Sequence, residues 1–517
     1  EKSTELKTEG STTGDRRLYI QATLNYNRKF NKVHDVNAML LYNQEENNSD
    51  PVDLFTSLPR RKQGIAGRLS YAFSHKYLIE ANFGYNGSEN FPKSKKFGFF
   101  PSVALGYNIA EENFWKPLKN ILPQFKMRAS WGLVGNDQTG AGRFTFLEDL
   151  NNAGIAFMTG TGSSGQSKTL SGPTWIRYAN PNLTWEVGEK INVGLDTRIF
   201  YDLAFSIDFF KEKRTDIFME RASIPAMLGT GATKISANLG EMENKGIDAS
   251  LDYNKQFNKN WFISFKGTFT YAHNKILKRD EPLNRQYPNV STIGNPVNTI
   301  YGYISDGLIK DQAMLDAYDK THGFANFPLM PGDIKYKDIA DVNGNTDNVI
   351  NTNDRVAMGY PTVPEIIYGF GPSIKFKNLD FSFFFQGAAR TSLMMSGFHP
   401  FVGNSNTARR GVLDFVAENC WTTTNPNEFA KYPRLTSKDN LNNNQNSSYW
   451  LRDASFLKLK NAEIGYTIKN MRFYISGSNL LTISSFKLWD PEMGGGSGMK
   501  YPTQRTINFG FQMTINN

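Results

Sequence analysis

Apolar and polar residues alternate along many segments of this chain, which is the period of a β-strand with two different faces. Between residues 261 and 271, one face carries Trp261, Ile263, Phe265, Gly267, Phe269 and Tyr271. The other face carries Phe262, Ser264, Lys266, Thr268 and Thr270. Burial of Lys266 in a dry core would be costly, whereas a water-filled lumen accommodates it. The pattern therefore predicts a strand that faces lipid on one side and water on the other.

The same alternation recurs often enough to predict about fifteen strands. Many of them are about nine to eleven residues long, which is the length that crosses a bilayer at a tilt. The predicted strands are residues 16–28, 33–45, 61–74, 77–88, 96–109, 122–134, 183–200, 203–213, 244–255, 261–273, 365–375, 380–388, 451–467, 472–481 and 503–515.

The connections between these strands alternate in length, short then long. Tight turns are predicted at residues 29–32, 75–76, 201–202, 256–260, 376–379 and 468–471. Long loops are predicted at residues 46–60, 89–95, 214–243, 274–364, 389–450 and 482–502, with a short helix within 311–320. Transmembrane barrels have short periplasmic turns and long extracellular loops. The predicted fold class is therefore all-β, an antiparallel transmembrane β-barrel.

The odd number of strands indicates an incomplete barrel. An open sheet cannot lie in lipid with its edge groups unpaired, and single-chain bacterial barrels usually have an even number of strands. We therefore expect this chain to form part of a barrel.

Composition agrees with this interpretation. The 517 residues contain no run close to the roughly 18 apolar residues of a membrane helix. The mean hydropathy of -0.48 suits a barrel with a watery lumen, because only one residue in two faces lipid. Aromatic residues make up 14%, which suits interfacial girdles. The net charge of +9 comes without a long basic run, so we expect no nucleic-acid partner.

The sequence contains no catalytic constellation. Its five histidines include no pair at the i, i+4 spacing of a zinc helix, and the single cysteine, Cys420, has no histidine nearby. A nucleophile elbow is also missing. An outer-membrane lipase or protease is therefore not favoured, and we expect no enzymatic activity.

Several segments resemble the SusC/RagA family of TonB-dependent outer-membrane transporters. The most specific is Tyr449-Trp-Leu-Arg-Asp-Ala-Ser-Phe-Leu-Lys-Leu-Lys-Asn-Ala-Glu-Ile-Gly-Tyr-Thr467, followed by Arg472-Phe-Tyr-Ile-Ser-Gly-Ser-Asn-Leu-Leu-Thr482. It is similar to a hairpin near the C-terminus of family members. Further blocks occur in family order at Asn180–Glu186, Asn192–Asp196, Gly240–Asp248, Ile300–Ile309, Pro331–Asp338, Asp354–Gly359 and Phe383–Gly387.

The resemblance implies a barrel of about 22 strands whose lumen holds an N-terminal plug. Residues 1–517 would then be the C-terminal portion of the TonB-dependent receptor-type barrel domain. The plug, the segment that contacts TonB and about seven strands are expected to lie outside this chain, which agrees with the odd strand number.

The resemblance also implies a function. Family members import an oligomeric nutrient, a glycan or a peptide, across the outer membrane of a Gram-negative bacterium. A SusD-like surface lipoprotein caps the extracellular side, TonB acts through the plug, and lipid surrounds the barrel. An alternative is a SusC-like barrel that serves as a structural subunit of an outer-membrane complex without transport. An upstream plug with a TonB-contacting segment would favour the transporter.

One candidate metal site comes from the same resemblance. Family members often carry a calcium-loop-like Asp-x-Asn-x-Asp-Gly segment where this chain has residues 341–354. Asp341, Asn343, Asn345 and Asp354 are the candidate Ca²⁺ ligands, because this cation prefers oxygen donors. Asn345 replaces a family aspartate and the glycine after it is missing. An asparagine-rich ordered loop without calcium is the other interpretation, and no cofactor is required.

Aromatic residues in the long loops have two interpretations, stacking on sugar rings or packing within the loops. No single residue is assigned to the substrate, which the sequence does not identify. We expect the loops at 274–364 and 389–450 to form the docking surface for the lipoprotein and the nutrient. The aromatic residues are Trp175, Tyr178, Phe324, Phe327, Phe398, Phe401, Trp421, Tyr449 and Trp450.

Overall fold

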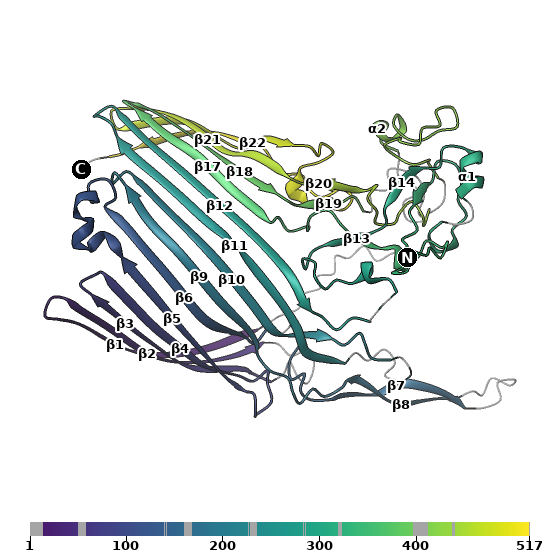
Figure 1. The fold of residues 1–517 in the computed structure, drawn as a ribbon, viewed down its shortest axis with the longest axis horizontal. Helices are drawn as coiled ribbons and strands as arrows, with labels where there is room; N and C mark the ends of the chain where they lie inside the picture. The colour runs from purple at the N-terminus through teal and green to yellow at the C-terminus, as the bar shows by residue number, and fades with distance from the viewer. Residues whose placement is uncertain are drawn as a thin grey trace, which may run out of the picture.

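The computed structural model is a curved, open antiparallel sheet of fifteen strands (Figure 1). Each strand pairs with the sheet strands that precede and follow it in the chain. The sheet is therefore an up-and-down meander, the arrangement of a barrel wall. The structure describes residues 14–49, 58–138, 140, 142–159, 168–225, 227, 235–282, 284, 286–318, 323–396, 412–436 and 440–515.

All fifteen predicted strands are confirmed. In order across the sheet they are β1 (Asp15–Phe30), β2 (His34–Ser49), β3 (Arg60–Phe73), β4 (Tyr77–Ser88), β5 (Phe97–Asn108), β6 (Gln124–Asn136), β9 (Glu186–Ile199), β10 (Leu203–Glu220), β11 (Ser236–Gln256), β12 (Trp261–Lys278), β17 (Ile366–Phe376), β18 (Leu379–Ala389), β21 (Phe456–Ile468), β22 (Met471–Ser484) and β23 (Thr506–Met513).

The register places apolar residues together on one face of the sheet. On β12, Phe269 lies opposite Ala249 of β11 and Tyr368 of β17. Residues directly opposite each other project from the same face. Large side chains of this face, such as Phe269 at 41%, are exposed rather than packed in a core. The face suits contact with lipid, as predicted from the alternation.

The tight turns gather at the end of the sheet where the chain terminates (Figure 1). Two of them, at Asn31-Lys32 and Ser74-His75, place both central residues at positive φ, between 48° and 61°. The turn bonds run from Val33 N to Phe30 O at 3.1 Å and from Lys76 N to Phe73 O at 2.9 Å. Such paired positive φ angles give type I′ turns, whose twist matches that of the flanking strands.

Apart from residues 109–123, which lie with the tight turns, the long connections lie at the opposite end and contain structure of their own (Figure 1). We call the described residues of 300–358, 391–396, 412–454 and 485–496 the loop domain. They share one core, which includes Ile334, Tyr336, Trp421 and Trp450. Its strands and helices are β13 (Ile300–Gly302), β14 (Ser305–Leu308), α1 (Gln312–Tyr318), β15 (Ile334–Tyr336), β16 (Val356–Met358), β19 (Ser392–Met394), α2 (Asp414–Ala417) and β20 (Leu451–Asp453).

Several predicted boundaries are wrong. The connection expected at 214–243 is shorter, because β10 continues to Glu220 and β11 begins at Ser236. A register shift after Arg214, beside Asp216 at a φ of 56°, interrupts the alternation and hid this extension. A separate hairpin, β7 (Asp149–Thr159) and β8 (Lys168–Arg177), was also not predicted.

The helix predicted within 311–320 is confirmed as α1. Besides α1 and α2, the described residues include 3-10 turns at η1 (Ile109–Glu111), η2 (Asn113–Leu118), η4 (Pro288–Val290), η6 (Phe324–Asn326), η7 (Thr352–Asp354) and η8 (Pro491–Met493). Across the described ranges, no helix has both the length and the apolar character needed to cross a bilayer.

Candidate functional site

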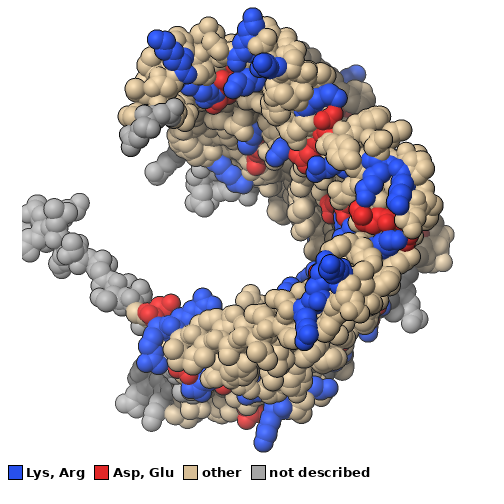
Figure 2. All heavy atoms as spheres, turned by 90° about the vertical axis from the view of Figure 1, so that its left-hand side faces the viewer, with Lys and Arg blue, Asp and Glu red and all other residues tan. Residues whose placement is uncertain are grey.

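The inner wall of the curved sheet is polar. Figure 2 looks onto the tight-turn end and shows an open C with basic and acidic side chains along its concave side. Two hollows of about 390 and 540 Å³ lie along the sheet. Charged and hydroxyl groups on this wall would be costly in a dry core. The wall therefore suits a lumen that holds water or a polar polypeptide.

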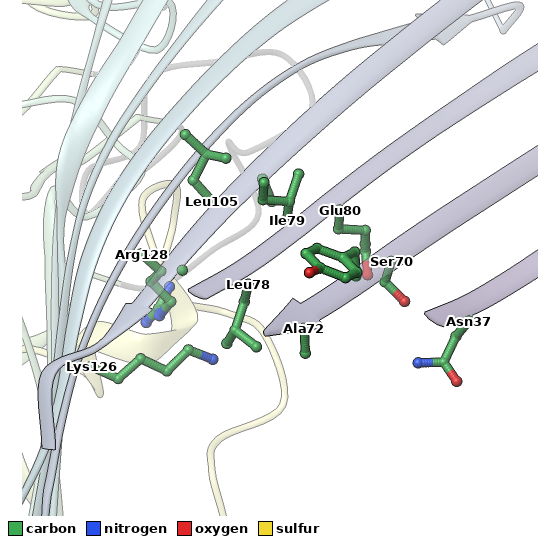
Figure 3. A pocket seen from close by; sticks show the side chains of 12 residues that line it. Asn37, Ser70, Ala72, Leu78, Ile79, Glu80, Leu105, Lys126 and Arg128 are labelled. Carbon is green, nitrogen blue, oxygen red and sulfur yellow. The ribbon is translucent and has the colours of Figure 1, made fainter. Parts of the chain in front are cut away.

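The first hollow borders a charge cluster that joins three strands. Arg128 of β6 contacts Asp196 of β9 at 3.0 Å, from Nε to Oδ2, and Asp208 of β10 at 2.6 Å, from Nη2 to Oδ2. Its Nη2 also donates to Ser206 Oγ at 3.2 Å. Figure 3 shows Arg128 and Lys126 beside this hollow. The alternation of side chains along each strand, together with the register, places all these groups on one face of the sheet.

The second hollow lies along the C-terminal strands and is rich in hydroxyl groups. Arg472 of β22 pairs there with Glu463 of β21 at 2.5 Å and with Asp380 of β18. Lys266, predicted to face a watery lumen, lines the same hollow and is exposed. Its polar lining consists of Ser264, Lys266, Ser373, Ser382, Asn461, Glu463, Ser476, Ser478 and Asn508.

The loop domain is held together by a buried polar network around Asp333, which is 0% exposed. Its Oδ1 accepts from Arg434 Nε at 2.7 Å, Asn440 Nδ2 at 2.9 Å and Asn443 Nδ2 at 3.0 Å. Its Oδ2 accepts from Met330 N at 2.8 Å and from Arg434 Nη2 at 3.2 Å. The single carboxylate thus joins the loop after β12 to the loop after β18.

The asparagine tract that follows Asn440 completes this network. Asn442 Nδ2 donates to Ile334 O at 2.8 Å, and Asn443 Oδ1 accepts from Ile334 N at 2.9 Å. Tyr336 donates its hydroxyl to Asn442 O at 2.7 Å, and burial raises the pKa of that tyrosine far above its usual range. Sequence reasoning missed the tract because its composition is that of a flexible loop, and its partners lie about 100 residues away.

The candidate calcium ligands lie on two different turns. Asp341 Oδ1 accepts from the backbone N–H groups of Asn343 at 2.8 Å and Asn345 at 2.9 Å, and bonds of this kind lower the pKa of Asp341. Asp354 instead caps η7, where its carboxylate accepts from Asn351 N at 2.7 Å and Ile339 N at 2.8 Å. Burial raises the pKa of Asp354 to about 6.

Two of the four candidate ligands, Asp341 and Asp354, are carboxylates, and they lie on separate turns. Within the described ranges, no three aspartate, glutamate, histidine or cysteine side chains lie together as a metal site requires. The carboxylates of Asp341 and Asp354 already accept backbone bonds, which are the contacts of an ordered asparagine-rich loop. The side chains of Asn343 and Asn345 are exposed. Calcium binding by these residues stays a prediction.

The loop aromatic residues divide into two groups. Trp421 and Trp450 are buried in the core of the loop domain, with Phe324 and Tyr449 packed against it. Trp175 is 38% exposed and stacks on Tyr178 with ring centroids 5.3 Å apart. Phe327 is half-buried. Phe398 and Phe401 lie outside the described residues.

The profile of the family described as TonB dependent receptor-like, beta-barrel matches residues 3–480. The chain belongs to this family. A TonB-dependent receptor, P26, of Formosa agariphila is 30% identical over 488 residues, which cover 87% of this chain and 46% of that protein. The TonB-dependent receptor SusC of Bacteroides thetaiotaomicron is 26% identical over 473 residues, which cover 86% and 43%.

Solved structures show the same fold. The RagAB peptide transporter matches with a TM-score of 0.74 and 21% identity, over 97% of this chain and 56% of that chain. Together with SusC, this match confirms the SusC/RagA resemblance found in the sequence. The chain spans about half the length of the curated relatives it matches. The family is one of receptors and transporters rather than enzymes. Membership of this family of outer-membrane receptors assigns the chain to the outer membrane.

Proposed function

We propose that this chain forms the C-terminal part of the barrel of a SusC-like transporter that imports an oligomeric nutrient, a glycan or a peptide. The observation that carries the proposal is the two-faced sheet, apolar outside and charged inside, in a chain that matches the family over residues 3–480. In such a transporter the apolar face contacts lipid and the polar wall surrounds the plug.

The luminal charge clusters suit a wall that meets a polypeptide. Arg128 and Arg472 each use two carboxylates of neighbouring strands, so both guanidinium groups are held in place before anything enters the lumen. The surrounding serines offer hydroxyl groups that both donate and accept hydrogen bonds. A plug that TonB pulls upon would slide along such a wall by exchanging these bonds for bonds to water.

The loop domain is the proposed docking surface for a SusD-like lipoprotein and for the incoming nutrient. It gathers at the end of the sheet opposite the tight turns (Figure 1). Support comes from RagAB, whose solved structure is that of a peptide transporter, and from SusC. This support leaves the nutrient class open between a glycan and a peptide.

The test uses the full-length protein, purified from the outer membrane in detergent without crosslinking. We expect a SusD-like lipoprotein to co-purify with it, and uptake of the nutrient by intact cells to be lost when TonB is deleted. A matched strain with TonB restored controls for secondary effects of the deletion. Purification as a lone barrel, together with uptake that is independent of TonB, would refute the proposal.

A further inference from the structure

The connection between β5 and β6 lies with the tight turns but is longer than they are, because residues 109–123 form the 3-10 turns η1 and η2 (Figure 1). We call residues 109–123 the rim segment. Trp115 donates its Nε1 to Leu122 O at 3.1 Å, within the segment. Ile121 O accepts from Phe200 N at 2.8 Å, in the turn between β9 and β10. The rim segment is therefore a folded part of this end of the wall.

The register shows which face of the sheet meets the rim segment. Residues directly opposite each other on neighbouring strands project from the same face. The apolar face that carries Phe269 can be followed in this way from strand to strand as far as β4. The row runs through Ala249, Ile207, Leu195, Met127, Tyr107 and Tyr77.

The rim segment is folded onto this apolar outer face. Trp115 stacks on Phe125, with ring centroids 5.1 Å apart, and Phe125 stands on β6 two residues before the member of that row. The hydroxyl groups of Tyr77 and Tyr107 donate to Glu112 Oε1 at 2.8 and 3.4 Å. Both tyrosines belong to the same row. The segment therefore lies on the side of the wall that contacts lipid rather than on the luminal side.

The rim segment exposes large apolar side chains. Phe114 is 67% exposed, and Leu118 and Ile121 are exposed as well. The neighbouring turn adds Phe200 and Tyr201, which are also exposed. Single exposed apolar residues are ordinary on protein surfaces, but a group of them marks an interaction surface. This group continues the lipid-facing surface of the wall to its rim.

One basic side chain of the rim segment has no protein counter-charge. Lys116 is exposed and lies between two of these apolar residues in η2. The lysines around it are paired, Lys119 with Glu111 at 3.1 Å and Lys76 with Glu112 at 2.9 Å. Within the described part of the chain, the Lys116 side chain forms no ion pair or hydrogen bond. Apolar residues beside a free lysine suit a membrane interface, where long basic side chains reach the head groups.

We propose that the rim segment binds the phospholipid surface of the periplasmic leaflet and fixes the depth of the wall in the bilayer. Phe114 and Leu118 enter the boundary between head groups and acyl chains, and Lys116 contacts a lipid phosphate. A water-soluble protein fits this surface less well, because the segment continues a wall that is covered by lipid. The inference depends on the place of the wall in the membrane and goes beyond the proposed transport.

The first experiment measures depth in the full-length receptor, reconstituted in nanodiscs of phosphatidylethanolamine and phosphatidylglycerol. Native cysteines, Cys420 among them, are replaced by serine, and one fluorophore is attached to Phe114→Cys or, separately, to Leu118→Cys. We expect both labels to lose emission to a phospholipid with a nitroxide high on its acyl chain, and to keep it against aqueous iodide. A label at Lys32→Cys, in the tight turn between β1 and β2, is the matched control and should respond to iodide instead.

The second experiment tests the phosphate contact. The nitroxide is carried either by anionic phosphatidylglycerol or by zwitterionic phosphatidylcholine, and the label stays at Leu118→Cys. We expect a preference of about fivefold for phosphatidylglycerol, which is the effect of one lysine at a membrane surface. Lys116→Gln should remove most of this preference. Lys337→Gln, which changes an exposed lysine of the loop domain at the opposite end, should leave it unchanged.

Two outcomes would overturn the inference. Quenching of the labels at 114 and 118 by iodide alone would place the rim segment in water, where a periplasmic protein would be the better partner. Equal lipid preference of Lys116→Gln and the wild type would exclude the phosphate contact. Neither measurement requires TonB or a nutrient, so a failure here leaves the proposed function standing, and a failure of uptake leaves these results unaffected.

Discussion

Replacement of Asp333 by alanine should unfold the loop domain locally while the barrel wall stays intact. The substitution removes the acceptor of Arg434, whose side chain is 19% exposed, and of two buried asparagine amides. Breaking a buried ion pair by removing one partner costs about 3–5 kcal/mol. Orphaned neutral donors add about 1–3 kcal/mol each where water cannot reach them. These terms are not additive, so we expect the free energy of unfolding of the loop domain to fall by about 3–5 kcal/mol.

The assay is hydrogen exchange in the full-length receptor, followed at the amides of Ile334 and Trp421. Ile334 N donates to Asn443 Oδ1 and Trp421 N donates to Tyr432 O, so both amides are protected only while the loop domain is folded. A loss of about 3–5 kcal/mol lowers protection there by roughly a hundredfold to several thousandfold. Amides of β11 and β12 should keep their protection, since these strands are held by the sheet ladder.

Asp306→Ala is the matched control, because it removes an exposed carboxylate from the same domain. The Asp306 side chain is 53% exposed and pairs with Lys335 at 3.4 Å. Loss of this exposed ion pair should lower the free energy of unfolding of the loop domain by only about 0–1 kcal/mol. Equal protection in the Asp333→Ala and Asp306→Ala variants would refute the assignment of the network as the structural centre of the loop domain. Loss of protection in β11 as well would refute the separation of domain and wall.

Three further predictions concern single sites. Ser74 and His75 both have a positive φ, which is costly for most L-residues but is well tolerated by Asn-Gly in a type I′ turn. The Ser74→Asn/His75→Gly double variant should therefore raise the free energy of unfolding by about 1 kcal/mol. An unchanged or lower unfolding midpoint would contradict this. Because burial raises the pKa of Asp354 to about 6, above its ordinary 3.8, the folded form binds the proton more tightly. The resulting stabilisation of the folded loop domain is present below about pH 4 and is lost as the pH rises through 6. Protection of the Ile339 amide against hydrogen exchange, corrected for the intrinsic exchange rate, should therefore fall between pH 4 and 6. In the Asp354→Asn variant this protection should not change with pH. Calcium, if bound by the candidate loop, should raise the melting temperature of the receptor, and Asp341→Ala should abolish the rise; no shift with calcium or chelator would end that prediction.

The strands of the wall were predictable because each carries the signal of its own fold. A strand such as β12 alternates along its whole length, and its partners follow directly in the chain. The signal failed where a local irregularity interrupted it, as at Asp216 in β10. The luminal clusters around Arg128 and Arg472 were within reach for the same reason, since the alternation fixes which side chains share a face.

The loop domain was not predictable from local pattern. Its strands β13 and β16 have three residues each, too few to show a period. Its stability depends on contacts between distant segments, such as Asp333 with Asn440. The candidate calcium ligands show the same limit, because spacing along the chain did not reveal that Asp354 caps a 3-10 turn of its own.

The loop domain is anchored to the wall at its base, and this bears on how import would be gated. Lys458 of β21 is 0% exposed and pairs with Asp490 at 2.6 Å and Glu492 at 2.5 Å, so the loop after β22 is fixed to the sheet. Breaking such a buried pair costs several kcal/mol, which makes a swinging motion of this loop improbable on thermal energy alone. In the proposed transporter, the motions that open and close the import path would therefore be made by the lipoprotein and the plug. The loop domain would present a preformed surface, so binding would not incur the entropic cost of ordering its loops.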